Sequence, residues 1–240
     1  FLRDGGVGIP FGQRLRIVRH LYRVHLFVPC PHRQEEILTY VRAILSLPRD
    51  LPGVLVEAGC FKGGSTAKLS LVAEMVGRRL VVFDSFEGIP ANDEPRQWNI
   101  FGTNVGFAQG EYRGGLEEVR GNVERYGRIG ACSFVRGWFD DTMPGFREPV
   151  GAAFVDVDLA SSTRTCLRYL YPLLQPGGVL CSHDGHLPLV IEVFEDDAFW
   201  QGEVGVPRPP IRGLHRTKVL TVVKEAASPA PAGAAVPAGA

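Results

Sequence analysis

The sequence predicts an α/β protein whose core is a doubly wound, parallel β-sheet. Short apolar, β-branched segments recur along the chain, segments of helical periodicity separate them, and several of the apolar segments end in glycine or an acidic residue. Apolar strands that alternate with helices are typical of parallel sheets with right-handed crossovers. A closed (β/α) barrel needs eight strand–helix units, and only about six or seven fit in this chain. We therefore expect an open sheet whose ligand site lies beyond the carboxyl ends of the strands.

The expected elements follow from periodicity and from breaker residues. Residues 14–28 and 32–47 carry apolar side chains at helical spacing, and Pro48 ends the second of these helices. The expected strands are 54–59, 80–84, 132–137, 152–158, 179–184 and 218–223. The expected helices between them are 64–76, 116–127, 162–174 and 187–199. Residues 85–113, rich in Gly, Pro and Asn, form a connection longer than an ordinary loop.

These elements divide the chain into three parts. Residues 1–50 are expected to form an N-terminal helical segment, and residues 51–225 the α/β domain. Residues 226–240 contain little besides Ala, Pro and Gly, so we expect a disordered tail.

Composition narrows the functional class. Lys and Arg together number 26, as do Asp and Glu, so no charge excess points to nucleic acid or to an acidic membrane. The five cysteines form no C-x-x-C pair, which favours buried, reduced thiols. No apolar stretch has the length of a membrane span or the form of a secretory signal. We expect a soluble, cytoplasmic protein, and the sequence leaves homo-oligomerisation open.

A first group of candidate residues lies where the first two strands end. Gly59 ends one strand, and Gly63 opens the next helix, where backbone N–H groups are free to bind a ligand. Asp84 ends the following strand, a position suited to bind ribose hydroxyls. An ordinary turn with a capping Asp gives the same pattern. No phosphate-binding G-x-x-x-x-G-K-[ST] motif occurs, which disfavours a P-loop nucleotidase.

A second group follows two later strands. Asp156 and Asp158 follow one strand, and His183 and Asp184 follow the next. We expect these strands to be neighbours, which would bring the four side chains to one sheet edge. Carboxylates and an imidazole suit a divalent cation or a general base. Helix capping by the Asp residues and a surface position for the His explain the pattern equally.

Five motifs together resemble a known family. They are V-E-A-G-C-F-K-G-G-S (56–65), D-S-F-E-G-I-P (84–90), G-W-F-D-D-T-M-P (137–144), D-V-D-L-A-S-S-T (156–163) and L-Y-P-L-L-Q-P-G-G (170–178). Their order and spacing are similar to those of the macrocin O-methyltransferase (TylF-like) family of S-adenosylmethionine-dependent enzymes, over residues 35–223. The resemblance implies a Rossmann-like class I methyltransferase domain, with a seven-stranded, mostly parallel sheet, an antiparallel last hairpin and helices on both faces.

The resemblance also implies a cofactor site for S-adenosylmethionine. The turn after the first strand would flank the methionine part, Asp84 would hold the ribose, and Trp138 would lie toward the adenine. The implied cofactor-binding residues are Glu57, Gly59, Gly63, Ser65, Asp84, Ser85, Trp138 and Phe139.

Family members typically bind a divalent metal, usually Mg²⁺, and the matching ligands here are Asp156, His183 and Asp184. This chain departs from the family, which has two adjacent acids where His183-Asp184 stands. Imidazole is a poorer Mg²⁺ ligand than carboxylate. Three outcomes stay open: the metal is kept, it changes to a transition metal, or it is lost and His183 acts as a base. Ala160 also replaces a family aromatic, which puts the acceptor pocket in question.

The resulting hypothesis is an O-methyltransferase of specialised, antibiotic-type metabolism that acts on a sugar or glycosylated small molecule. Asp156 is the first candidate for the base, alone or as a metal ligand, and His183 is the second. A Rossmann oxidoreductase and a non-catalytic methyltransferase-like binding protein are the alternatives.

Residues outside the motifs receive simpler expectations. His20, His25 and His32 lie in or next to the N-terminal helices and are expected on the helix surface, with a contact to the acceptor as the alternative. Trp98, Phe101 and Phe107 are expected either to pack onto the sheet or to form a lid or sugar platform.

Overall fold

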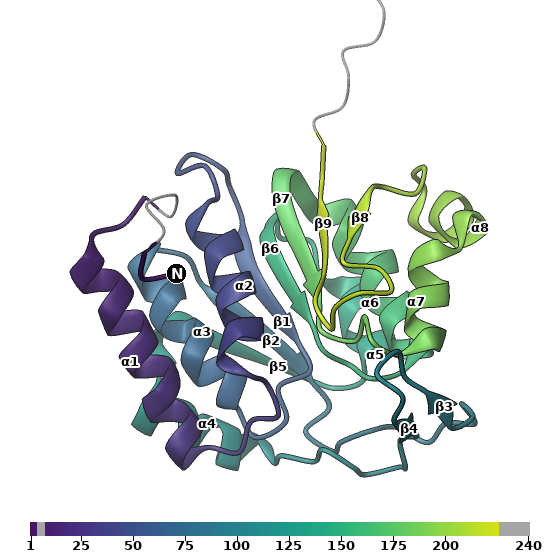
Figure 1. Cartoon of the computed structure of the whole chain (residues 1–240), viewed down its shortest axis with the longest axis horizontal. Helices are drawn as coiled ribbons and strands as arrows, with labels where there is room; N and C mark the ends of the chain where they lie inside the picture. The colour runs from purple at the N-terminus through teal and green to yellow at the C-terminus, as the bar shows by residue number, and fades with distance from the viewer. Residues whose placement is uncertain (4–7, 226–240) are drawn as a thin grey trace, which may run out of the picture.

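One seven-stranded sheet forms the core of the computed structural model, which describes residues 1–3 and 8–225 (Figure 1). The strand order is β5-β2-β1-β6-β7-β9-β8. The first five strands in this order are parallel, and β9 runs antiparallel to both of its neighbours. In chain order the strands are β1 (Val54–Ala58), β2 (Leu80–Asp84), β5 (Cys132–Arg136), β6 (Val150–Val155), β7 (Leu174–Ser182), β8 (Ile211–Arg212) and β9 (Leu220–Val223). The predicted fold class, including the antiparallel last hairpin, is confirmed.

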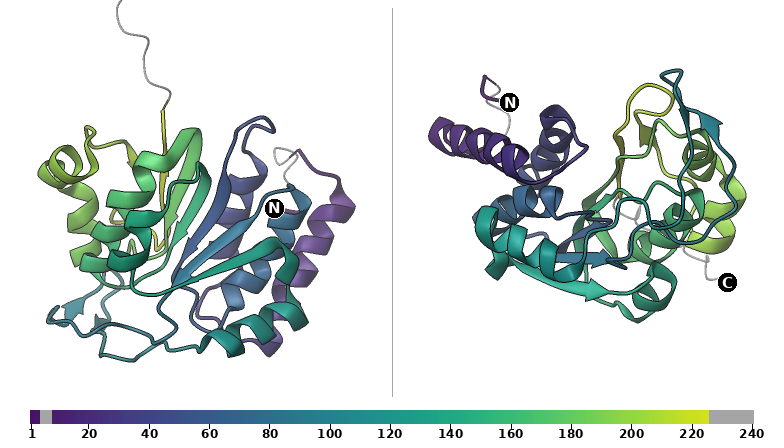
Figure 2. Two further views of the ribbon diagram at one scale, coloured as in Figure 1. Left: turned by 180° about the vertical axis from the view of Figure 1, so that it is seen from behind. Right: turned by 90° about the horizontal axis from the view of Figure 1, so that it is seen from below.

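Four helices cover one face of the sheet (Figures 1 and 2): α1 (Phe11–Phe27), α2 (Gln34–Leu45), α3 (Gly64–Met75) and α4 (Leu116–Tyr126). Helix α3 lies against the sheet and contacts the other three helices. Because it is enclosed on all sides, every residue from 64 to 73 is buried, including the ammonium-bearing Lys68. Apolar residues of α1 and α2 pack into the same core.

The opposite face carries α5 (Phe139–Thr142), α6 (Ala160–Leu173), α7 (Pro188–Glu195) and the short α8 (Asp197–Phe199). Helix α6 buries an apolar stripe against β6 and β7. Trp200, which begins a π-helical turn after α8, is fully buried against Tyr171 and Phe194. The two faces therefore have separate apolar cores on either side of one sheet.

The structure corrects several expected boundaries. The strand expected at 152–158 ends at Val155, because Asp156–Asp158 turn away and Asp158 takes a positive φ of 62°. The strand expected at 179–184 begins at Leu174 and ends at Ser182. The 85–113 segment contains a small antiparallel hairpin, β3 (Gln97–Trp98) with β4 (Asn104–Val105). The tail expected at 226–240 lies outside the described residues.

In the described ranges, no helix combines the length and the apolar character that crossing a bilayer requires. All five cysteines have free thiols; Cys30 and Cys132 are half-buried and the other three are buried.

Candidate active site

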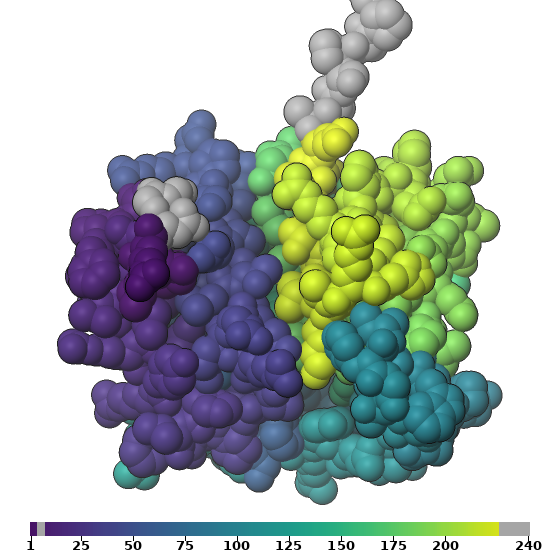
Figure 3. Space-filling view, in the orientation of Figure 1, coloured from purple at the N-terminus to yellow at the C-terminus, as the bar shows by residue number. Residues whose placement is uncertain are grey.

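A cavity of about 580 Å³ opens at the carboxyl ends of the parallel strands. Its walls come from the turns after β1, β2, β5, β6 and β7, from the α1–α2 linker and from the 85–113 segment. In Figure 3, the helices α1 and α2 (purple to blue) lie beside the C-terminal strands (yellow), and the β3–β4 segment (teal) lies below those strands. The volume lies within the range of small-molecule and cofactor sites, and the location is the one expected for an open parallel sheet.

The turn after β1 forms one wall of the cavity. Gly59 has a φ of +83°, and a Cβ atom there would collide with the backbone oxygen of Asp156. Only glycine therefore fits where β1 and β6 meet. Ser65 lines the cavity, whereas Gly63 does not and instead begins α3 with a φ of +79°. Gly64 and Ser65, the first two residues of α3, therefore form part of the cavity wall.

Glu57 lies behind this turn and not on the cavity wall. It is fully buried, its Oε2 atom accepts a hydrogen bond from the Thr66 hydroxyl at 2.6 Å, and its Oε1 atom has no partner. Burial raises the pKa of Glu57 to about 7. A ligand in the cavity therefore reaches this carboxyl group only through an intervening group, such as a water molecule.

Asp84 connects the ends of β1 and β2. Its two carboxylate oxygens accept hydrogen bonds from the backbone N–H groups of Cys60, at 2.7 Å, and Phe86, at 2.6 Å. Burial raises the pKa of Asp84, although these hydrogen bonds oppose the rise. The hydroxyl group of the neighbouring Ser85 accepts a hydrogen bond from the backbone N–H of Glu87. Asp84 and Ser85 both line the cavity. These hydrogen bonds hold the carboxylate next to the turn after β1.

Trp138 and Phe139 line the cavity beyond β5. The Trp138 carbonyl accepts hydrogen bonds from the backbone of Asp141 and Thr142, which starts α5. The Trp138 side chain remains 37% exposed, so a face of the indole is free. An aromatic face at this position suits a flat heterocycle.

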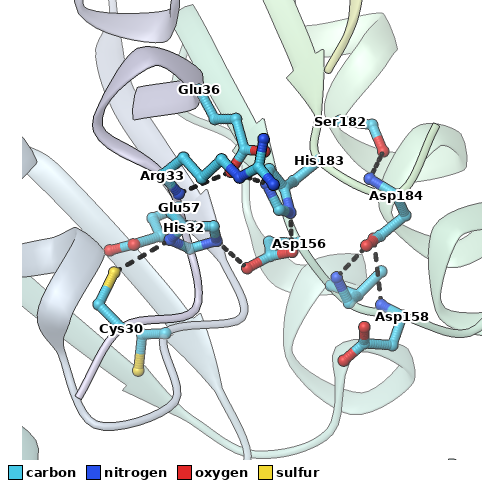
Figure 4. A network of polar contacts seen from close by, with 12 residues as sticks. Cys30, His32, Arg33, Glu36, Glu57, Asp156, Asp158, Ser182, His183 and Asp184 are labelled. Carbon is cyan, nitrogen blue, oxygen red and sulfur yellow. Dashed lines mark hydrogen bonds and ion pairs between the residues drawn. The ribbon is translucent and has the colours of Figure 1, made fainter. Parts of the chain in front are cut away.

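Asp156 and His183 meet at the ends of β6 and β7, as predicted (Figure 4). His183 Nδ1 lies 3.2 Å from Asp156 Oδ1, and a third residue joins them: His32 Nε2 lies 2.6 Å from Asp156 Oδ2. His183 Nε2 contacts Glu36 Oε2 at 3.0 Å. The expectation that His32 lies on a helix surface is wrong, because it sits in the α1–α2 linker and is 3% exposed.

The charges of this cluster are strongly coupled. Burial disfavours the charged form of each imidazole, but the Asp156 carboxylate outweighs it and raises the pKa of His183 to about 9 and that of His32 well above its usual value. Burial by itself would raise the pKa of the Asp156 carboxyl group. The two imidazoles outweigh this effect and lower that pKa. Burial opposes ionisation of Glu36, but His183 lowers the pKa of Glu36 to about 2. Asp156 is consequently a carboxylate held between two positive groups, and a weak base.

Asp184 is adjacent but makes different contacts. Its Oδ2 atom accepts the backbone N–H groups of Val157 and Asp158, at 2.9 and 3.1 Å, and holds the turn after β6. Its Oδ1 atom is buried without a partner. Burial, together with the nearby Asp156, raises the pKa of Asp184 to about 7.

The far wall of the cavity comes from the long connection. Phe107 and Tyr112 line the cavity, as does His186 from the turn after β7. Trp98 and Phe101 are more than half exposed and do not line it. Of the three loop aromatics singled out in the sequence, only Phe107 therefore lines the cavity.

Sequence reasoning missed three residues of the linker side: His32, Glu36 and Cys30. The signal that could have found them is the run Pro29-Cys30-Pro31-His32 between two helices, since two prolines hold a short linker extended. Apart from this run, the sequence around these residues does not indicate which side chains they contact in the folded protein.

The comparisons with known proteins agree with this geometry. The model of the macrocin O-methyltransferase (TylF) family matches residues 32–197. A tetracenomycin-class enzyme of Streptomyces olivaceus, named 8-demethyl-8-(2,3-dimethoxy-alpha-L-rhamnosyl)-tetracenomycin-C 4'-O-methyltransferase, is 35% identical over 66% of this chain and 62% of its own length. Mycinamicin III 3''-O-methyltransferase of Micromonospora griseorubida is 32% identical over 61% of this chain and 60% of its own length. The chain thus spans about three fifths of the length of these curated relatives.

Solved structures support the fold. The O-methyltransferase NovP superposes with a TM-score of 0.63 at 23% identity, covering 80% of this chain and 79% of that one. The calicheamicin methyltransferase CalS11 superposes with a TM-score of 0.61 at 18% identity, covering 88% of this chain and 92% of that one. At these identities the likeness establishes the architecture.

Proposed function

The chain belongs to the macrocin O-methyltransferase family, and we propose that it transfers the methyl group of S-adenosylmethionine to a hydroxyl group of a sugar or glycosylated small molecule. One observation carries this proposal: a single cavity holds the Asp84 carboxylate at its cofactor turn and the Asp156–His183 pair at its other end. The first suits a nucleoside, and the second suits a hydroxyl group that must lose a proton.

The cofactor half fits S-adenosylmethionine by its donor set. Asp84 Oδ1 and Oδ2 keep lone pairs beyond their backbone contacts, and these can accept the two ribose hydroxyls. We assign the space beside Gly59 and Ser65 to the methionine part and the Trp138 face to the adenine. The bound cofactor supplies a methyl group on a sulfonium, which is already a good leaving group. The protein must hold the acceptor oxygen in line with it.

Asp156 is our candidate for the proton acceptor, and His183 is the second candidate. Both line the cavity, so both can reach an acceptor hydroxyl. Because two imidazoles hold Asp156 ionised, it is a weak base, and a weak base needs a more acidic hydroxyl. A divalent cation supplies that acidity when bound.

We propose that the same residues hold a divalent metal ion. The unpartnered Oδ1 atom of Asp184 and the contacts between Asp156 and His183 are the observations that fit one. A mixed nitrogen and oxygen donor set suits Mn²⁺, Co²⁺ or Ni²⁺ better than Mg²⁺.

A sugar-bearing acceptor is proposed for two reasons. One relative is named for a rhamnosyl-bearing compound, and aromatic side chains of Phe107 and Tyr112 line the acceptor half of the cavity. Aromatic faces bind the apolar C–H faces of carbohydrates. Free cysteines suit a reducing compartment, so we propose a cytoplasmic location.

The direct test is product analysis by mass spectrometry after incubation with S-adenosylmethionine and a panel of rhamnosylated compounds. We expect a gain of one methyl group on the acceptor and release of S-adenosylhomocysteine in equal amount. Calorimetry with S-adenosylmethionine and with NAD separates this function from a Rossmann oxidoreductase. Tight binding of NAD without binding of S-adenosylmethionine would overturn the proposal.

A further inference from the structure

We propose that His32 is a metal ligand, so that the site is formed by two imidazoles and one carboxylate, His32, Asp156 and His183, and selects a first-row transition metal over Mg²⁺. This inference rests on the proposed function, because it names the metal and the third ligand of the same site. It also gives the α1–α2 linker a defined role in that site.

The geometry of the three side chains carries the inference. One donor atom from each residue lies within 4.8 Å of the other two. Ligand bonds of about 2.1 Å place neighbouring donor atoms roughly 3 to 3.5 Å apart, so small side-chain movements suffice. The two imidazole rings lie edge to face with centroids 4.4 Å apart, which lets one nitrogen of each point toward Asp156. All three side chains line the cavity, so a metal ion held by them would be accessible to an acceptor bound there.

The second nitrogen of each imidazole already has a partner. His183 Nε2 contacts Glu36 Oε2 at 3.0 Å, and His32 Nδ1 contacts Cys30 Sγ at 3.2 Å. Ligated histidines almost always donate their other N–H to an acceptor, which fixes the tautomer and the ring orientation. The outer contacts needed for two metal-bound histidines are therefore in place.

The donor chemistry decides which metal. Mg²⁺ prefers six oxygen ligands in octahedral geometry, whereas imidazole nitrogens suit Mn²⁺, Fe²⁺, Co²⁺, Ni²⁺ and Zn²⁺. Asp184 Oδ2 accepts two backbone N–H groups and holds the turn after β6, so only its unpartnered Oδ1 atom is left to add an oxygen to this donor set. The preference for a transition metal therefore comes from His183, which replaces a family acid, and from His32.

The test uses the full chain, freed of metal by chelation, with Co²⁺ as the probe. In proton NMR of the Co²⁺-loaded protein, each ligated imidazole contributes one strongly shifted, exchangeable N–H signal. We expect two such signals in the wild type and one in His32→Gln. Calorimetry should show Co²⁺ affinity falling by about 100-fold or more in His32→Gln, because one of three protein ligands is lost, with little change for Mg²⁺.

Two further variants keep the test decisive. His20→Gln is the matched control, since His20 also lies in the N-terminal helices but bonds to the Ala67 carbonyl away from the cluster; it should retain both signals. Glu36→Gln should weaken Co²⁺ binding by about 10- to 100-fold, the usual effect of an outer partner. If His32→Gln unfolds, as a thermal melt would show, the wild-type spectrum carries the test, because ligation by both His32 and His183 requires two shifted N–H signals and ligation by His183 alone gives one.

Failure of this inference differs from failure of the proposed function. Co²⁺ affinity within threefold of wild type in His32→Gln, two retained N–H signals, or tighter binding of Mg²⁺ than of Co²⁺ would overturn the metal assignment. Binding of S-adenosylmethionine, measured on the same metal-free samples, should survive His32→Gln. Loss of methyl transfer to every acceptor with Co²⁺ binding intact would overturn the proposed function and leave the metal site standing.

Discussion

The two ends of the cavity are built in different ways. At the end proposed for the cofactor, backbone groups and small side chains from the turns after β1 and β2 surround one carboxylate, Asp84. At the other end, charged side chains from three distant segments contact one another, with Asp156 between His32 and His183. The first end relies on local backbone geometry, and the second on mutual neutralisation of buried charges. Single substitutions should therefore have graded effects at the first end and large effects at the second.

The largest effect is expected from Asp156→Asn. The amide removes the proton acceptor and leaves two imidazoles without their shared carboxylate, so kcat should fall by about 100- to 10,000-fold. Steady-state turnover with the acceptor found in the product screen measures this.

Asp158→Asn is the matched control for that substitution. Asp158 also lines the cavity, and Asn tolerates the positive φ of 62° at this position. Its loss of activity should be far smaller. Equal losses in the two variants would contradict the assignment of Asp156.

Glu57→Gln should change how stability depends on pH. The pKa of Glu57 is raised from 4.5 to about 7 in the folded protein, so the folded state binds this proton more tightly than the unfolded state. The resulting stabilisation of the folded state is complete below about pH 4.5 and is lost as the pH rises through about 7. The free energy of unfolding of the wild type, relative to Glu57→Gln, should therefore fall by up to about 3 kcal/mol between pH 4.5 and pH 8. Urea denaturation at the two pH values checks this, and parallel pH curves for both proteins would contradict it.

Asp84→Ala should weaken binding of S-adenosylmethionine by about 1.5–3 kcal/mol, because hydrogen bonds to a charged group are lost. Calorimetry should show Kd rising by roughly 10- to 150-fold. Asp93→Ala, an exposed carboxylate in the following segment, is the control and should bind normally. An unchanged Kd for Asp84→Ala in a folded protein would remove Asp84 from the cofactor site.

Trp138→Ala should have the smallest effect. Loss of one aromatic face should weaken cofactor binding by about 0.5–1.5 kcal/mol. Trp98→Ala provides the comparison, because Trp98 is 67% exposed and does not line the cavity. Competition binding with S-adenosylhomocysteine measures both variants, and equal affinities would place the adenine elsewhere.

Local pattern was sufficient for most of the fold. The apolar runs at 54–59 and 80–84 correspond to β1 and β2 within one residue. The residues that end them, Gly59 and Ser85, directly follow the two strands in the sequence. The strand expected at 152–158 failed because Val157 continues the apolar alternation after the chain has already turned at Asp156. The hairpin within 85–113 has strands of two residues each, too short for periodicity to detect.

The sequence by itself determined the α/β class and the turn between β1 and α3, because a glycine turn, a helix start and a strand-end acid are each set by neighbouring residues. Only the tertiary structure decided which side chains meet Asp156. His32 is 124 positions away and Glu36 is 147 positions from His183. Such contacts depend on how α2 packs against β6 and β7, and that packing reflects the whole buried apolar surface of the face and not any local pattern.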